Sequence, residues 1–267
     1  MHRWIPVCLI VFISTGLWAD EQTFWAKKAQ NPLSDLIKYP IIARFDFGYG
    51  HKDAVNSTTS LRPSMVADVS KHWNLVNRLD LSFKYQPGRT LGEKDSFGMG
   101  DTTYEGFFTP SNDWKIDWGI GPAFQIPTAT DPQLGTRKWS AGAATAVNTE
   151  AGPFVFGLRA RHLWSFAGKD DRPDVNRTAV EYWLYANLGN GWWIGTSPVN
   201  MADWETSSED RWTVPLGGGF GKVVRQRIPI NLKLEAYSFA ELPNDLADWS
   251  VMFSLEYLLP ENALFKR

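Results

Sequence analysis

The stretch WKIDWGIGPAFQI, residues 114–126, decides the fold. Large apolar side chains occupy every second position, and small or polar residues fill the gaps. Because successive side chains of a strand point to opposite faces, one face of this segment is bulky and apolar. The polar break PTATDPQLGTRK follows, and the alternation resumes at residues 139–147. The two segments therefore predict a hairpin of two long strands.

The length of these strands favours a membrane barrel over a soluble sandwich. Each has about 9–11 residues, which is what a tilted strand needs to cross a bilayer. The chain contains 14 tryptophans and is 14% aromatic. A barrel with a lipid-facing apolar face, a polar lumen and aromatic girdles has this composition. The residues interpreted as girdle residues rather than as a ligand cage are Trp118, Trp139, Trp164, Trp192, Trp193, Trp212 and Trp249.

The N-terminus has the pattern of an export signal. His2 and Arg3 precede an apolar run over residues 4–18, and a cut after Ala19 fits a small residue at the cleavage site. A positive start, an apolar core of this length and a small residue at the cut are typical of a secretory signal peptide. Residues 1–19 are therefore predicted to be removed on export.

The remaining composition excludes several kinds of chemistry and partner. The only cysteine, Cys8, lies in the predicted signal peptide, so we expect neither disulfides nor a cysteine-bound metal, and no cofactor. One of the 27 Lys and Arg residues and none of the 29 Asp and Glu residues fall in that segment. The rest of the chain is close to neutral, which argues against nucleic acid as a partner.

The expected architecture is all-β: a transmembrane, antiparallel, up-and-down barrel of about 12 strands over residues 40–260. Residues 20–39 do not alternate, and two alternatives remain open for them: a periplasmic lead-in, or a plug folded into the lumen, with a short helix on either side of Pro32. Residues 261–267 form a tail. The connections alternate between long and short, which fits short periplasmic turns, longer outer loops and both termini in the periplasm. Two polar segments, HKDAVNSTTSLR and SPVNMADWETSSEDR, are interpreted as long outer loops.

Charged side chains that oppose an apolar face are predicted to line the lumen. In residues 75–86, Arg78, Asp80 and Lys84 oppose a row of Leu, Phe and Tyr side chains. An Arg or Lys facing lipid near mid-membrane costs about 2–4 kcal/mol, so the charged face points inward. The full predicted lumen set is Arg44, Asp46, Arg78, Asp80, Lys84, Asp101, Glu105, Lys115, Asp117, Arg159, Arg161, Glu181, Lys233, Glu235 and Glu256. These residues either line a passage or binding cavity, or pair with one another and fill a narrow lumen.

Three motifs carry a resemblance to a known family. They are IPTATDPQLGTRKWSAG (126–142), LWSFAGKDDRPDVNR (163–177) and RWTVPLGGGFGK (211–222). The chain resembles the Gram-negative outer-membrane proteins labelled MetA-pathway phenol-degradation transporters, sometimes mislabelled neuromedin U. The resemblance implies a channel or transporter in the outer membrane for small solutes, among them small aromatic or apolar compounds. It also singles out an outer-loop set, namely Pro127, Thr128, Asp131, Lys138, Trp139, Asp170, Arg172, Asp174 and Asn176.

The expected partners follow from this interpretation: outer-membrane lipid, a small-molecule solute and, during biogenesis, the barrel-assembly machinery. Many outer-membrane barrels end on an aromatic residue that this machinery recognises. This chain ends PENALFKR, with Phe265 two residues before the end, so the assembly signal is either internal or altered.

Other functions have weaker support in the sequence. The glycine run at 217–219 lacks the spacing of a phosphate loop, and the acids of residues 169–176 fit a solvated loop better than a calcium site. Outer-membrane phospholipases use Ser and His on the lipid-facing surface. Here His162 and Ser165 lie on opposite faces of one predicted strand, so spacing offers no catalytic triad. We expect no enzyme, and a pore-less structural or adhesion barrel is the main alternative to a channel.

Overall fold

The computed structural model describes residues 21–50, 53–88, 90, 92–111, 114–243 and 247–260. The predicted signal peptide (1–19) and C-terminal tail (261–267) lie outside the described residues. The first element of the described part is α1 (Glu21–Gln30). The strands are β1 (Leu36–Tyr49), β2 (Ala54–Leu61), β3 (Ser64–Ser70), β4 (Trp73–Gln86), β5 (Ser96–Met99), β6 (Thr102–Pro110), β7 (Ile116–Ile126), β8 (Lys138–Ala151), β9 (Phe154–Gly168), β10 (Asn176–Gly189), β11 (Trp192–Thr196), β12 (Val199–Asp203), β13 (Trp212–Val224), β14 (Ile230–Glu241) and β15 (Trp249–Pro260).

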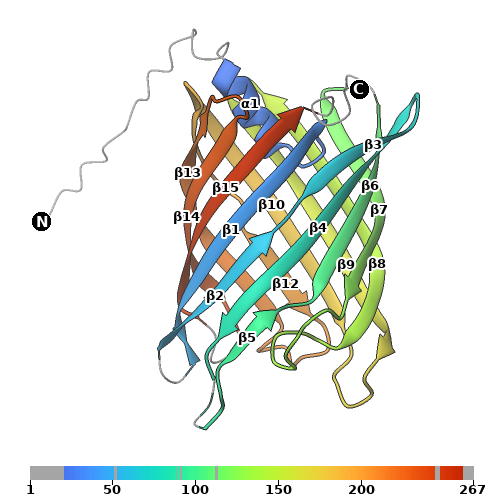
Figure 1. Ribbon diagram of the computed structural model, residues 1–267, viewed down its shortest axis with the longest axis vertical. Helices are drawn as coiled ribbons and strands as arrows, with labels where there is room; N and C mark the ends of the chain where they lie inside the picture. Colours follow the sequence, from blue (N-terminus) through green and yellow to red (C-terminus); the bar gives the residue numbers. More distant parts are fainter. Residues whose placement is uncertain are drawn as a thin grey trace, which may run out of the picture.

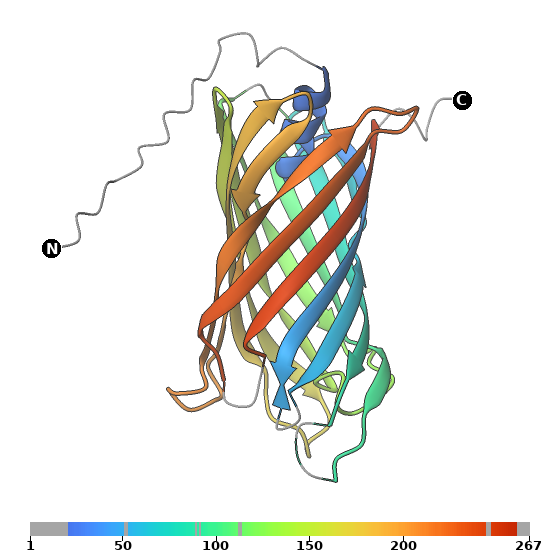
Figure 2. The same ribbon diagram turned by 90° about the vertical axis from the view of Figure 1, so that its left-hand side faces the viewer.

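The strands form one closed antiparallel barrel (Figures 1 and 2). β1 closes the ring by pairing with β15, from Leu36 opposite Pro260 to Phe47 opposite Trp249. Three of the membrane-crossing segments are each divided into two strands, namely β2 and β3, β5 and β6, and β11 and β12. The fifteen strands therefore make twelve crossings, the number that the sequence predicted. Among the described residues, no helix has the length and apolarity needed to cross a membrane.

The two ends of the barrel differ in their connections. The end that holds α1 has connections of two to five residues, and the opposite end has connections of four to eleven. Bacterial barrels have short periplasmic turns and longer outer loops. We therefore name these the periplasmic end and the outer end.

Two segments interpreted as loops are strands. β2 occupies most of HKDAVNSTTSLR, which leaves an outer connection of only residues 50–53, and β12 occupies the start of SPVNMADWETSSEDR. The predictions were wrong because these strands carry Ser, Thr and Asn where a soluble strand would carry an apolar face. Pairing with β1 and β4 satisfies the backbone of β2, and its polar side chains can face the lumen.

The outer surface is an apolar belt with tryptophans at both ends. Trp139, Trp164 and Trp249 are exposed near the outer end, and Trp192 near the periplasmic end. Trp193, however, is not a girdle residue, because only 1% of it is exposed. Two consecutive residues of a strand point to opposite faces, so Trp192 and Trp193 cannot both face lipid.

The β1 strand contains a second departure from simple alternation. The register with β2 shifts between Phe47 and Tyr49, and Gly48 has a φ of +78°. Phe45 and Phe47 keep the predicted apolar face, whereas Tyr49 is buried and lines the interior. The bulge at Gly48 thus turns Tyr49 inward, away from the face that strict alternation predicts.

Inward aromatic rings occupy the space above glycines on neighbouring strands. Trp183 lies opposite Gly157, and Trp193 lies opposite Gly221. A Cβ atom at either glycine would overlap the indole ring of its partner. Glycine therefore makes the room in the wall that each ring fills.

The assignment of the apolar side chains to the lipid-facing surface can be tested by placing an arginine at two different depths in the bilayer. Leu234 is exposed near the middle of β14, and Leu188 is exposed near the periplasmic end of β10. Leu234→Arg should lower the free energy of unfolding in lipid by about 2–4 kcal/mol, and Leu188→Arg by only about 0–1 kcal/mol. Equal losses, measured by reversible denaturant unfolding in bilayers, would contradict the assigned membrane position.

Candidate functional site: the barrel lumen

The periplasmic end of the lumen holds α1 (Figures 1 and 2). The helix buries Thr23, Ala26 and Gln30. Ala26 belongs to an apolar cluster with Val155, Trp183, Tyr185, Trp193 and Val223, which come from strands β9, β10, β11 and β13. An apolar inner surface was not expected from the sequence, and it forms here because the helix covers it.

Polar contacts also anchor α1 to the wall. The amides of Gln30 and Asn187 exchange two hydrogen bonds, at 3.1 and 3.0 Å, and both residues are buried. Lys27 Nζ donates to the carbonyl oxygen of Gly152 at 2.7 Å and lies 3.3 Å from Glu150 Oε2. Buried amides that satisfy each other fix the helix in one register against β10.

Lys38 holds the C-terminal end of α1. Its side chain is buried, and Nζ donates to the carbonyl oxygens of Lys28 (3.0 Å), Ala29 (3.2 Å) and Asn31. Carbonyls at a helix C-terminus have no partner inside the helix, and a cation there also complements the helix dipole. Sequence reasoning missed Lys38, because it placed this residue in the N-terminal segment, whereas β1 begins at Leu36.

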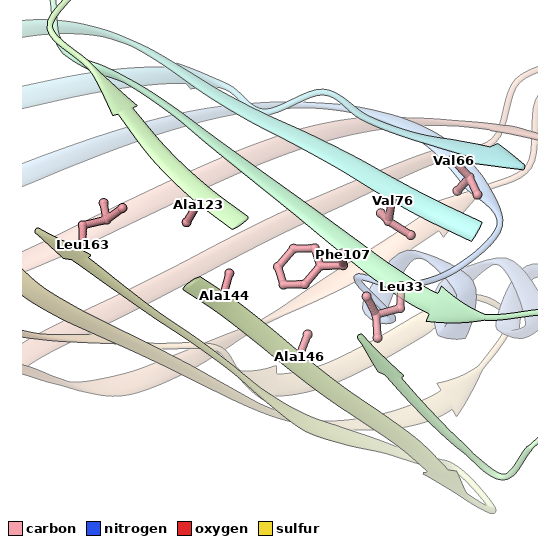
Figure 3. Close-up of a cluster of buried hydrophobic side chains, with 8 residues drawn as sticks. All are labelled: Leu33, Val66, Val76, Phe107, Ala123, Ala144, Ala146 and Leu163. Atoms are coloured by element: carbon pink, nitrogen blue, oxygen red, sulfur yellow. The ribbon is translucent and has the colours of Figure 1, made fainter. Parts of the chain in front are cut away.

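The segment after α1 packs against apolar side chains of β4, β6 and β8. Leu33 lies in a cluster with Val76, Phe107 and Ala146, and Figure 3 shows its side chain beside Phe107. Asn31 Nδ2 donates to Asp117 Oδ2 at 2.6 Å. These contacts place Asn31 and Leu33 against the inner face of the wall formed by β4, β6, β7 and β8.

The middle of the lumen contains a network of charges centred on Glu105. This carboxylate is 3% exposed and lies 3.0 Å from Arg159 Nη1 and 3.3 Å from Arg161 Nη1. Arg159 also pairs with Glu181, and Arg78 Nε is 3.9 Å from Glu105. Buried charges are tolerated when they are paired in this way.

A second polar group lies on β14 and β15. Glu235 accepts hydrogen bonds from Ser197 Oγ and Tyr237 Oη, both at 3.0 Å, and Lys233 Nζ is 3.4 Å away. Glu256 Oε2 accepts from Asn231 Nδ2 at 3.0 Å. The predicted inward orientation of these carboxylates thus agrees with their contacts.

The lumen is not filled by these pairs, because a cavity of about 630 Å³ remains. It extends from Gln30 and Pro32, in the N-terminal segment, to Tyr49 and Leu242 near the outer end. Members of the predicted set that line it are Arg44, Asp46, Arg78, Lys84, Arg161, Glu181, Lys233, Glu235 and Glu256.

The other members of the predicted set have different places. Asp80, Glu105 and Arg159 do not line the cavity and form ion pairs with Arg62, Arg78, Arg161 or Glu181. Lys115 is exposed in the turn before β7, so its prediction as a lumen residue was wrong. Lys115 precedes Ile116, the first residue of β7 that pairs with β8. The alternation of a strand therefore does not set the direction of the Lys115 side chain.

At the outer end, the loop of residues 127–137 is held by Asp101. The carboxylate accepts hydrogen bonds from the Thr136 backbone N (2.7 Å), Thr136 Oγ1 (2.8 Å) and the Ala129 backbone N (3.3 Å). Lys84 Nζ donates to the carbonyl oxygen of Leu134, a loop residue that is only 1% exposed. The loop is thus a packed part of the barrel end.

The outer-loop set divides between this loop and its neighbour. Pro127, Thr128 and Asp131 lie in the first loop, Asp170, Arg172 and Asp174 lie in the next, and Lys138, Trp139 and Asn176 begin strands. Arg172 Nη2 donates to the carbonyl oxygens of Pro132 and Gly135, both at 2.9 Å. Arg172 therefore ties the two loops together.

Lys138 makes a second link between the loops. Its Nζ lies 3.0 Å from Asp174 Oδ1, and this hydrogen bond holds the pKa of Asp174 below its usual range.

Among the described residues, no group of three His, Cys, Asp or Glu side chains could hold a metal ion.

One outward histidine bears on the hydrolase alternative. His162 Nδ1 is 2.7 Å from Thr178 Oγ1, and Trp204 Nε1 donates a hydrogen bond to the same Thr178 oxygen at 2.8 Å. The other ring nitrogen, Nε2, is buried without a hydrogen-bond partner. Within the described part of the chain, no carboxylate orients this imidazole, so the arrangement lacks the third member of a hydrolytic triad.

Comparisons with known proteins agree on the architecture. The sequence matches no protein-family profile and no curated protein. The structure is similar to the COG4313 outer membrane channel from Pseudomonas putida F1, with a TM-score of 0.63 and 14% identity over 85% of this chain and 97% of that one. It is less similar to the calcium-bound outer membrane phospholipase dimer from Salmonella typhi, with a TM-score of 0.44 and 12% identity over 89% and 97% of the two chains. The similarity to the channel shows that the chain has the fold of a Gram-negative outer-membrane β-barrel.

Proposed function

We propose that this protein is an outer-membrane channel for small solutes whose periplasmic end is closed by α1 and the segment that follows it. The observation that carries the proposal is the cavity of about 630 Å³ that runs from this segment towards the outer loops. Ligand cavities of known proteins have about 300–1,000 Å³. A barrel stabilised only by internal packing would have no reason to retain such a space.

The lining supports passage of molecules that are partly apolar. Charged and hydroxyl side chains alternate around the cavity with Ile42, Trp183, Tyr185 and Met252. The resemblance to the MetA-pathway family implies small aromatic or apolar solutes, and the similarity to an outer membrane channel supports the channel role alone. We include small aromatic or apolar compounds among the proposed solutes, with outer-membrane lipid around the apolar belt and the barrel-assembly machinery as the partner during insertion.

Removing residues 21–35 tests the closure directly. The deletion leaves β1 intact, because this strand begins at Leu36. Single-channel conductance in planar bilayers should rise relative to the full chain, since the helix occupies the periplasmic end of the lumen. The control is Arg225→Gln, which removes only the exposed contact of Arg225 with Glu21 and should leave the conductance unchanged.

Two outcomes would count against the proposal. Equal conductance in the full and shortened proteins would show that α1 closes nothing. If neither protein conducts ions, the result favours the packed, pore-less barrel, and the function would then lie in the outer loops.

A single substitution should loosen the closure without deleting it. Lys38→Met removes the donor that satisfies three carbonyls near the end of α1. Leaving buried carbonyls without partners costs about 1–3 kcal/mol, so we expect less stable packing of α1 and more frequent open events in bilayer recordings. Lys71→Met, in an exposed turn, is the matched control. Identical gating in both variants would show that Lys38 does not hold the helix.

A further inference from the structure

The charges that face the cavity are unequal in sign. Eleven charged side chains line it, and seven are Lys or Arg while four are Asp or Glu. They are Lys38, Arg44, Arg62, Arg78, Lys84, Arg161 and Lys233 against Asp46, Glu181, Glu235 and Glu256. Asp80, Glu105 and Arg159 pair with these residues without being part of the lining, and including them leaves eight Lys and Arg side chains against six Asp and Glu side chains. The void therefore faces an excess of positive charge.

The strand register brings part of this excess together. Lys38 lies opposite Ser64, and Ser64 lies opposite Arg78, so these residues form one row across β1, β3 and β4. Arg62 lines the cavity two residues before Ser64, and Arg161 reaches the same network through Glu105. Three guanidinium groups, those of Arg62, Arg78 and Arg161, thus border one region of the cavity.

The network has one more arginine than it has acids: Arg62, Arg78, Arg159 and Arg161 against Asp80, Glu105 and Glu181. Glu105 is shared by Arg78, Arg159 and Arg161, and its distance to Arg78 Nε, 3.9 Å, is at the limit of an ion pair. Arg62 Nε lies 2.8 Å from Asp80 Oδ2, but it has no well-aligned hydrogen bond. A guanidinium carries five N–H donors, so both side chains retain donors for a ligand.

The same region offers hydroxyl and apolar surface. Ser60 and Ser64 line the cavity next to the arginines. Ile42 pairs with Ser60, and the Pro40 carbonyl oxygen accepts from the Arg62 backbone N at 3.0 Å, so an apolar strip borders the cationic row. A ligand that suits both surfaces has a negatively charged group and an apolar body.

We propose that the lumen contains a binding site for a small organic anion, whose carboxylate binds Arg62, Arg78 and Arg161 while its apolar part contacts Pro40 and Ile42. The proposal deepens the proposed channel function by naming its solute class. Guanidinium groups match the geometry of a carboxylate and bind it through two hydrogen bonds. A solute amine of the same shape would meet the positive row and be repelled.

Binding in detergent tests the proposal without requiring an open channel. We would titrate hexanoate, hexylammonium and inorganic phosphate into the refolded full-length protein by calorimetry, and subtract the heats of protein-free micelles. Hexanoate should bind and hexylammonium should not. Phosphate should bind more weakly than hexanoate, because it makes no use of the apolar strip.

Substitution assigns the binding to the site. Arg78→Gln and Arg62→Gln should each weaken hexanoate about tenfold or more, since a charge-assisted hydrogen bond contributes about 1.5–3 kcal/mol. Arg227→Gln, in an exposed turn, makes the same charge change and should leave hexanoate binding unaltered. The folded state of each variant is checked by its heat-modifiable migration on a gel.

Three results would overturn the proposal. They are equal binding of hexanoate and hexylammonium by the unchanged protein, absence of hexanoate binding, and full hexanoate affinity in a folded Arg62→Gln/Arg78→Gln variant. Tighter binding of phosphate than of hexanoate would replace the organic acid with an inorganic anion. A protein that conducts but does not bind hexanoate keeps the channel function and loses this site. A protein that binds hexanoate but does not conduct ions keeps this site and loses the channel function.

Discussion

The structure depends on closure of the hydrogen-bond ring by β1 and β15. In lipid, no water is present to satisfy a strand edge, so every backbone N–H and C=O group of the wall needs a partner within the sheet. The register from Leu36/Pro260 to Phe47/Trp249 supplies these partners where the first and last strands meet. Once the ring is closed, alternate side chains face lipid and lumen, and the inward charges must pair with one another.

The closed ring also explains the unusual interior. A lumen of this width has to hold a helix, two apolar clusters and a charge network, and the wall provides space where it carries small residues. Ala144 and Ala146 on β8 face Leu33, and Gly157 and Gly221 lie beneath Trp183 and Trp193. Buried Lys38 from the wall then satisfies backbone carbonyls at the end of α1. The same packing of the N-terminal segment against the wall therefore holds this segment in place and forms one end of the cavity.

Much of this could be predicted from period-two patterning, and the failures have identifiable physical causes. The pattern predicted twelve spans and an inward orientation that contacts support for residues such as Glu105 and Glu235. It missed β2 and β12, because a strand that faces a polar lumen needs few apolar residues. It misplaced Tyr49, because one glycine bulge inverts every face that follows. No pattern in the sequence signals that Lys38 meets the end of α1, since that contact exists only after the barrel has closed.

Lys38 belongs both to the contacts that hold α1 and to the row of cations that faces the cavity. Its ammonium group is directed at carbonyls of the N-terminal segment, while its position in β1 places it in the same row as Ser64 and Arg78. A cation committed to carbonyl oxygens remains a full charge, so it contributes to the positive potential of the cavity while it holds the helix. The segment that closes the periplasmic end and the surface that attracts an anion therefore share one side chain, and a change at Lys38 acts on both.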